Sequence, residues 1–108
     1  MAGWRSRKNK KPEHIIEDYL VDKVEALGYW CPKWQGTQGV PDRIIFLPEQ
    51  KMCFVELKRE VGGKRSPMQN VRSEQLTYFG HPSFFVHTKA QVNKLVSSLK
   101  QGVIPEKI

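Results

Sequence analysis

The sequence has few cysteines and no long apolar stretch. Cys31 and Cys53 are the only two cysteines in 108 residues, and no Cys-x-x-Cys pair occurs. Neither lies in a zinc-like cluster with a histidine, so we expect both thiols to stay reduced, with Cys53 inside a strand. No apolar run is long enough to cross a bilayer, and no apolar signal core follows the charged N-terminus. We therefore expect a soluble intracellular protein.

The sequence also lacks an internal repeat, a domain linker and a hydrolase triad. His14 falls on the polar face of its expected helix, where it would be solvated, and His81 and His87 have no acid and nucleophile arranged around them. A chain of 108 residues is long enough for one domain and too short for two. Its small core leaves little stability to spare, which favours an oligomer.

Negative charge is scarce, above all in the first eleven residues. The net charge is +7 and the pI about 9.6, which favours a polyanionic partner, nucleic acid first. We expect residues 1–11 to form a basic flexible tail and residues 12–108 a single domain. The tail has no acid and supplies five of the seven net charges, through Arg5, Arg7, Lys8, Lys10 and Lys11. One reading of this tail is a solubilising arm or an expression remnant without a binding role. The other is an arm that binds phosphates.

Apolar periodicity and turn residues predict seven elements in the order α-β-β-β-α-β-α. A strand, a helix and a further strand in the second half imply a crossover, so we expect a mixed β-sheet flanked by helices. Ser66-Pro67-Met68-Gln69 predicts a helix start with a capping box. The expected helices are 12–27, 67–79 and 89–100, and the expected strands are 28–34, 43–47, 52–58 and 83–88.

The first predicted helix carries acids where apolar residues are expected. At about 100° per residue, Glu13 and Glu17 fall inside the arc formed by the apolar side chains of residues 15–27. An acid on a buried face must find a partner inside the protein. For Glu17 that partner is either a metal ion, reached directly or through water, or a cation such as Lys23 or an arginine from the core edge.

The two strands 43–47 and 52–58 bring a second group of polar residues together. Glu56 and Lys58 lie two apart and share one face of their strand. Antiparallel pairing across the loop brings Asp42 close to Glu56 or its neighbours. Two carboxylates side by side are costly unless a cation sits between them, and hard oxygen ligands suit Mg²⁺ or Mn²⁺. The main-chain carbonyl of Leu57 offers a further oxygen.

This arrangement predicts metal-dependent phosphodiester hydrolysis, although each piece has a plainer reading. Lys58 can orient the attacking water or stabilise the transition-state oxyanion, and Gln69 can reach the water or a phosphate. Alternatively, Glu56 and Lys58 form an exposed ion pair, Asp42 is a turn residue and Gln69 is only a helix cap. Three basic residues in the loop 59–65 are candidate DNA contacts: Arg59, Lys64 and Arg65.

Over residues 12–100 the sequence resembles the VRR-NUC domain of the PD-(D/E)XK nuclease superfamily, in its stand-alone phage and bacterial form. The motifs that carry the resemblance are Glu13-x-x-x-Glu17, Gly39-Val40-Pro41-Asp42-Arg43, Phe54-Val55-Glu56-Leu57-Lys58, Ser66-Pro67-Met68-Gln69 and the helix end at Gly80. The resemblance implies a restriction-endonuclease-like core, and a protein that works in a bacterial or phage-host cytoplasm.

Trp30 and Trp34 are expected to pack in the core or at a sheet edge rather than stack on bases.

The resemblance also implies an activity and its residues. Asp42 and Glu56 would hold Mg²⁺ or Mn²⁺, Lys58 would be the catalytic lysine, and Gln69 matches the family's glutamine. Glu17 would be the helix acid, because related junction-cleaving nucleases carry it at a similar distance before the helix-ending glycine; Glu13 is the alternative. The implied protein is a homodimeric endonuclease for DNA, including Holliday junctions. A non-catalytic DNA-binding module and an RNA-processing nuclease are the other hypotheses.

Overall fold

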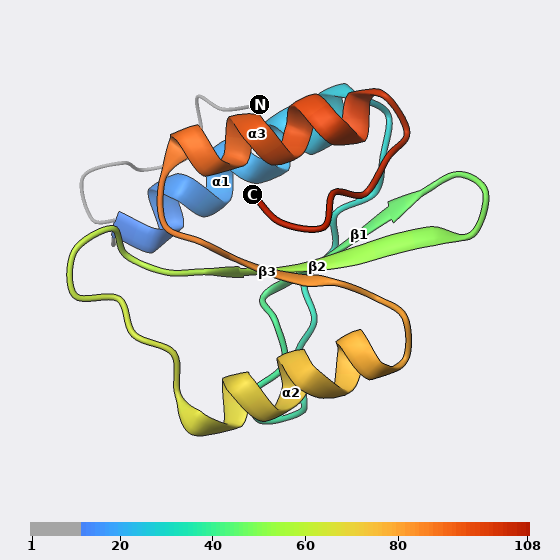
Figure 1. Cartoon of the computed structure of the whole chain (residues 1–108). Coiled ribbons are helices and arrows are strands. Elements are labelled where there is room, and N and C mark those ends of the chain that lie inside the picture. The colour runs from blue at the N-terminus through green and yellow to red at the C-terminus, as the bar shows by residue number, and fades with distance from the viewer. Residues whose placement is uncertain (1–11) are drawn as a thin grey trace.

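The fold is a three-stranded mixed sheet with helices on both faces (Figure 1). The computed structural model describes residues 12–108 and their side chains from His14 onward, so the expected tail of residues 1–11 lies outside the described residues. The elements are α1 (Pro12–Ala26), β1 (Arg43–Leu47), β2 (Lys51–Leu57), α2 (Pro67–Tyr78), β3 (Ser83–Val86) and α3 (Lys89–Lys100). β2 lies in the middle, antiparallel to β1 and parallel to β3. The predicted fold class is confirmed.

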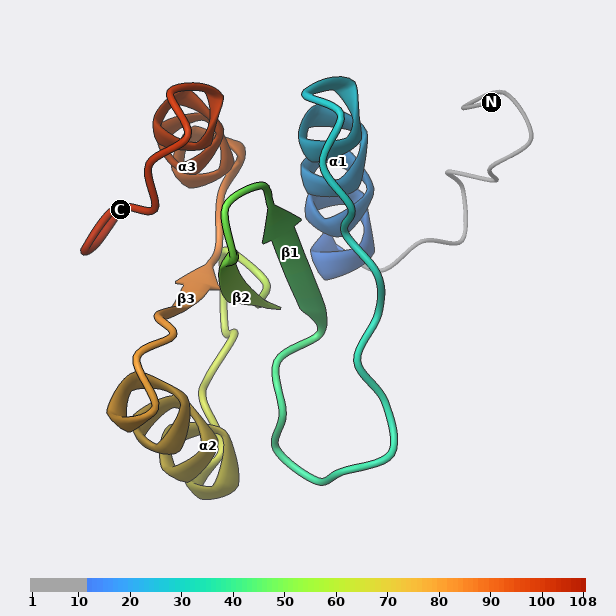
Figure 2. The same ribbon diagram turned by 90° about the vertical axis from the view of Figure 1, so that its right-hand side faces the viewer.

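The main core lies between the sheet and the pair of helices α1 and α3, which cover the same face (Figures 1 and 2). Alternation along β2 sends Cys53, Val55 and Leu57 into this core and leaves Phe54 and Glu56 on the opposite face. Cys31 and Cys53 are both buried, and Cys53 lies inside β2 as expected. The helices contribute Ile16, Leu20, Val21, Val24, Val92, Leu95 and Leu99.

The segment 28–34 differs from its sequence-based expectation. Instead of a continuous strand it makes two isolated bridges to β1, Trp30 with Phe46 and Lys33 with Arg43. Pro32 stands between the two bridges and has no N–H to donate, which interrupts a regular ladder. The segment still covers the edge of β1, and Trp30 stacks on the Phe46 ring with centroids 5.2 Å apart.

Helix α2 lies on the face of the sheet away from α1 and α3 (Figure 1). It begins with the predicted capping box: the Ser66 hydroxyl accepts a hydrogen bond from the Gln69 N–H at 3.1 Å, and the Gln69 side-chain oxygen accepts one from the Ser66 N–H at 2.9 Å. The helix has no buried residue, and the Arg72 Nε on α2 donates a hydrogen bond to the Gln38 carbonyl of the preceding loop at 3.0 Å. Across residues 12–108, none of the helices has the length and apolar character needed to span a membrane.

Candidate active site

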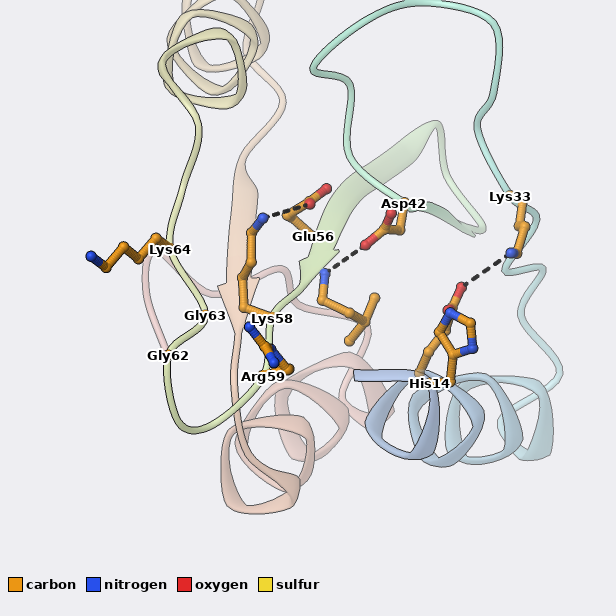
Figure 3. Close-up of a pocket in the computed structure, with 11 residues that line it drawn as sticks. His14, Lys33, Asp42, Glu56, Lys58, Arg59, Gly62, Gly63 and Lys64 are labelled. Atoms are coloured by element: carbon orange, nitrogen blue, oxygen red, sulfur yellow. Dashed lines mark hydrogen bonds and ion pairs between the residues drawn. The ribbon is translucent and has the colours of Figure 1, made fainter. Parts of the chain in front are cut away.

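A cavity of about 780 Å³ opens at the end of the sheet where β1 begins and β2 finishes (Figure 3). It gathers residues from α1, the 28–34 segment, the two strand ends and the loop 59–65. Its acids are Glu17, Asp42 and Glu56, and its bases are Lys33, Lys58, Arg59 and Lys64, with His14 at its rim. The predicted acids Glu17, Asp42 and Glu56 and the predicted catalytic lysine, Lys58, are therefore brought together.

Asp42 is fixed at the head of β1 by two hydrogen bonds. Its carboxylate oxygen Oδ2 accepts a bond from the Leu57 N–H at 2.8 Å, and its main-chain carbonyl accepts one from the Trp34 N–H at 3.0 Å. The β1–β2 register pairs Arg43 with Val55, which places Asp42 next to Glu56 across the ladder. Burial raises the pKa of Asp42, and the Leu57 N–H opposes that shift.

Glu56 is only 5% exposed and is held through one oxygen. Its Oε2 lies 3.4 Å from the Lys58 ammonium and accepts a hydrogen bond from the Gln69 side-chain amide. Its Oε1 is buried, and no described group stands in hydrogen-bonding geometry to it. Burial raises the pKa of Glu56 to about 7, and the Asp42 carboxylate acts in the same direction, whereas Lys58 and the Asp42 main chain oppose it. An unsatisfied buried carboxylate oxygen beside a second acid is a place that favours a cation.

Glu17 reaches the cavity from α1 but is already paired. The Arg43 Nε donates a hydrogen bond to its Oε2 at 2.8 Å, and the Arg43 Nη1 donates another to the Cys31 carbonyl at 3.0 Å. The partner of this buried acid is thus an arginine from the core edge and not Lys23. The alternative acid Glu13 lies outside the described side chains.

Arg43 is a residue whose importance the sequence reasoning missed. Two features of the sequence indicate its role. Glu17, inside the apolar arc of α1, needs a cation as partner. Arg43 follows Asp42 directly in a strand, so its side chain points to the opposite face of the sheet. Asp42 therefore faces the cavity beside Glu56, while Arg43 reaches through to α1 and fixes Glu17.

The capping reading of Gln69 is confirmed, and the structure adds a contact with Glu56 that the sequence did not predict. Its side-chain oxygen completes the capping box of α2, and its amide nitrogen donates to the Glu56 carboxylate. The helix start therefore determines where the Glu56 partner lies. The basic loop is divided: Arg59 and Lys64 line the cavity, whereas the Arg65 guanidinium stacks over the Phe85 ring at 3.6 Å and lines a different hollow.

The donor set fits a magnesium-like ion better than a metal enclosed by protein ligands. Within residues 12–108, no three side chains of His, Cys, Asp or Glu form a metal-binding group. Mg²⁺ typically uses one or two carboxylates and takes its remaining ligands from waters and substrate phosphates. Asp42 and Glu56 supply two carboxylates, and the Leu57 main chain at the cavity wall offers a further oxygen.

Two known proteins are similar to this chain. A solved structure described as "VRR_NUC domain" superimposes with a TM-score of 0.73 at 30% identity, covering 82% of this chain and 97% of that one. The "Putative nuclease p44" of Acyrthosiphon pisum secondary endosymbiont phage 1 is 39% identical over 71 residues, which cover 64% of this chain and 75% of the relative. The chain belongs to the VRR-NUC family. It is a nuclease, and the predicted family is confirmed.

VRR-NUC nucleases generally depend on a divalent metal ion. The family assignment depends on the relative and on the solved structure, because no family model matches the chain.

Gly39 lies in the loop that leads to Asp42 and packs closely against Met68 of α2. We predict that Gly39→Ala destabilises the domain by more than about 1 kcal/mol. Gly39 has φ +83°, and a Cβ there would lie 2.4 Å from the Met68 Cγ and 2.8 Å from the Met68 carbonyl. Gly36→Ala is the matched control, since φ is +99° there but nothing lies within 4 Å. Urea unfolding of both variants measures the difference; equal losses would show that the contact with Met68 contributes nothing.

The double role of Gln69 predicts that Gln69→Glu keeps α2 but slows nucleic-acid cleavage by about tenfold to a hundredfold. A glutamate still accepts the Ser66 N–H, but it places a second carboxylate where Glu56 needs a donor. Gln91→Glu is the control, because Gln91 completes an equivalent capping box with Thr88 on α3, away from the acids. Circular dichroism and initial cleavage rates separate the two roles; equal rates in the two variants would rule out a role for the Gln69 amide at Glu56.

Proposed function

We propose that this VRR-NUC domain is a Mg²⁺- or Mn²⁺-dependent endonuclease that hydrolyses DNA phosphodiester bonds. The observation that carries the proposal is the buried, unsatisfied Oε1 of Glu56, next to Asp42 and in the same cavity as Lys58. Such an oxygen is costly in a protein without a ligand, and a divalent cation would satisfy it.

Each residue has a role that follows from its contacts. Asp42 and Glu56, with the Leu57 carbonyl, would hold the cation, whose chemistry is to activate water and to neutralise charge on the phosphate. Lys58 lies 3.4 Å from Glu56 and would orient the attacking water or stabilise the oxyanion. Gln69 fixes the Glu56 carboxylate through Oε2. Glu17, engaged by Arg43 through Oε2, would act through a water molecule.

We infer branched DNA, including Holliday junctions, as the preferred substrate and a homodimer as the working form. Kinship with the VRR-NUC family supports both, because a two-fold dimer would present two active sites to a junction of matching symmetry. The rival hypotheses are a DNA-binding module without activity and a nuclease for RNA. The full acid set disfavours the first, because binding alone does not require two desolvated carboxylates.

A substrate panel tests the proposal. Purified protein is incubated with labelled duplex, flap, four-way junction and single-stranded RNA in Mg²⁺, Mn²⁺ or EDTA. We expect internal cleavage of DNA with either metal, none in EDTA, and the fastest rate on the junction. Cleavage confined to RNA would support the RNA hypothesis, and salt-dependent binding without cleavage in any metal would support the non-catalytic one.

The raised pKa of Glu56 predicts a pH-dependent stability without metal. Its pKa is 4.5 in the absence of the fold and about 7 in the folded chain, so the folded state binds more protons between these values. This contribution to the free energy of unfolding is fully present below pH 4.5 and is lost as the pH rises through about 7. The increase in Tm produced by Mg²⁺ should therefore be larger at pH 7 than at pH 4.5, because the ion binds the carboxylate form.

Thermal unfolding of the wild type and of Glu56→Gln, with and without Mg²⁺, measures this effect. The glutamine variant should lose both the pH slope in this window and most of the Mg²⁺ stabilisation. A Mg²⁺ shift of the same size in both proteins would place the ion elsewhere.

A further inference from the structure

The cations of the cavity lie on two sides of its acids (Figure 3). Lys58, Arg59 and the glycine-containing loop stand on one side of Asp42 and Glu56. Lys33 and His14 stand on the other, above α1. A nucleic-acid strand that crosses the acids would therefore meet positive charge both before and after the reacting phosphate.

Lys33 is not needed to neutralise Glu17. Arg43 already contacts Glu17 at 2.8 Å and is only 16% exposed, whereas Lys33 lies 4.0 Å from the same oxygen and is 52% exposed. A half-exposed pair at that distance contributes little to stability. The Lys33 ammonium is therefore available to a ligand in the cavity.

The position of Lys33 is fixed relative to Asp42 by the main chain. Lys33 forms a bridge with Arg43, and the next residue, Trp34, donates its N–H to the Asp42 carbonyl at 3.0 Å. The backbone of Lys33 is thus held at a fixed position relative to Asp42. Only the Lys33 side chain must become ordered when a ligand binds.

His14 adds a hydrogen-bond donor to the same side. It lies one helical turn before Glu17 on α1, and its exposed ring stands at the cavity rim near Lys33 (Figure 3). An imidazole N–H and an ammonium group are suitable partners for the oxygens of a phosphodiester.

We propose that Lys33 and His14 form a second phosphate subsite, which binds the phosphodiester next to the one that is cleaved, on the α1 side of the cavity. The inference rests on the proposed nuclease function and assigns part of its substrate grip to residues outside the acid and lysine motifs. Lys33 supplies a point charge and His14 a directed donor, so the subsite fixes the register of the strand without reading its bases.

The test compares DNA binding by Lys33→Ala, His14→Ala and Lys94→Ala at several salt concentrations in EDTA, where cleavage is absent. Lys94 is an exposed lysine of α3 away from the cavity and serves as the matched control. Loss of one phosphate contact should lower the slope of log K against log salt by about 1 for Lys33→Ala and leave it unchanged for Lys94→Ala. His14→Ala should weaken binding with a smaller change of slope.

A methylphosphonate walk in Mg²⁺ locates the subsite on the substrate. One neutral methylphosphonate is placed at the phosphodiester next to the cut, on one side only. It should slow cleavage by the wild type, but it should not slow Lys33→Ala beyond the loss that this variant already shows. Equal salt slopes for Lys33→Ala and Lys94→Ala, or independent effects of the variant and the neutral linkage, would overturn the subsite. A wild type that cleaves nothing while Lys33→Ala still loses slope would instead remove the nuclease proposal and keep the phosphate contact.

Discussion

Glu56→Gln is expected to slow metal-dependent cleavage by at least about a hundredfold to a thousandfold, while the domain stays folded and still binds DNA. The substitution keeps the size of the side chain and an oxygen that can accept the Gln69 bond. It removes the charge that would hold the cation next to Asp42. Asp42→Asn and Lys58→Ala should reduce the rate to a similar degree, because the three groups act on the same phosphate.

Glu60→Gln is the matched control for this variant, since Glu60 is an exposed acid four residues further along the chain that does not line the cavity. Single-turnover rates in Mg²⁺ should match the wild type for Glu60→Gln. Binding in EDTA should be retained by both variants and become slightly tighter for Glu56→Gln, because one negative charge leaves the DNA-facing cavity. Wild-type rates in Glu56→Gln and Asp42→Asn would show that the activity comes from another site.

The same substitution should make the protein more stable near neutral pH. Glu56 is buried, shares its surroundings with Asp42 and has a pKa raised to about 7, so its ionised form opposes folding. A glutamine removes that opposition. In its proposed role, Glu56 would therefore serve function at the expense of stability, as buried acids in active sites typically do.

The hairpin could be predicted from sequence because its determinants are local. Alternation along residues 52–58 places Val55 and Leu57 on one face of the strand and Glu56 on the other. In an antiparallel ladder that pairs Arg43 with Val55, Asp42 stands opposite Glu56. The capping box at Ser66 and Gln69 was equally predictable, since its spacing is three residues. Each of these depends on backbone geometry over a short stretch.

What sequence reasoning missed depends on contacts between distant segments. Arg43 and Glu17 are separated by 26 residues, and only the packing of α1 on the sheet shows that they meet. The Gln69 amide reaches Glu56 because α2 begins over the open face of β2, which no local pattern encodes. Lys33 was overlooked for a similar reason: its place in the cavity follows from two isolated bridges to β1.

Adjacent residues at the start of β1 connect the site to the core. Asp42 points to the cavity and Arg43 to α1, so a shift of this short stretch would move the Asp42 carboxylate and break the Glu17 pair together. The Pro-Asp-Arg run of the VRR-NUC chain therefore carries both a proposed metal ligand, Asp42, and the arginine that joins α1 to the sheet. This coupling leads to the largest expected loss of stability.

Arg43→Ala is expected to lower the free energy of unfolding by about 3 kcal/mol or more, because it leaves the buried Glu17 carboxylate and the Cys31 carbonyl without their donor. Lys33→Ala, which removes the distant and half-exposed partner of the same acid, should cost less than about 1 kcal/mol. Urea unfolding at neutral pH measures both.

The double variant Glu17→Leu with Arg43→Met separates an uncompensated charge from lost packing. Replacing both members of a buried pair by apolar groups is often close to neutral, so most of the Arg43→Ala loss should be recovered. If the double variant is as unstable as Arg43→Ala, the arginine stabilises the domain by packing and through Cys31. If Lys33→Ala is as damaging as Arg43→Ala, Lys33 is the true partner of Glu17, and its charge is not available to a phosphate.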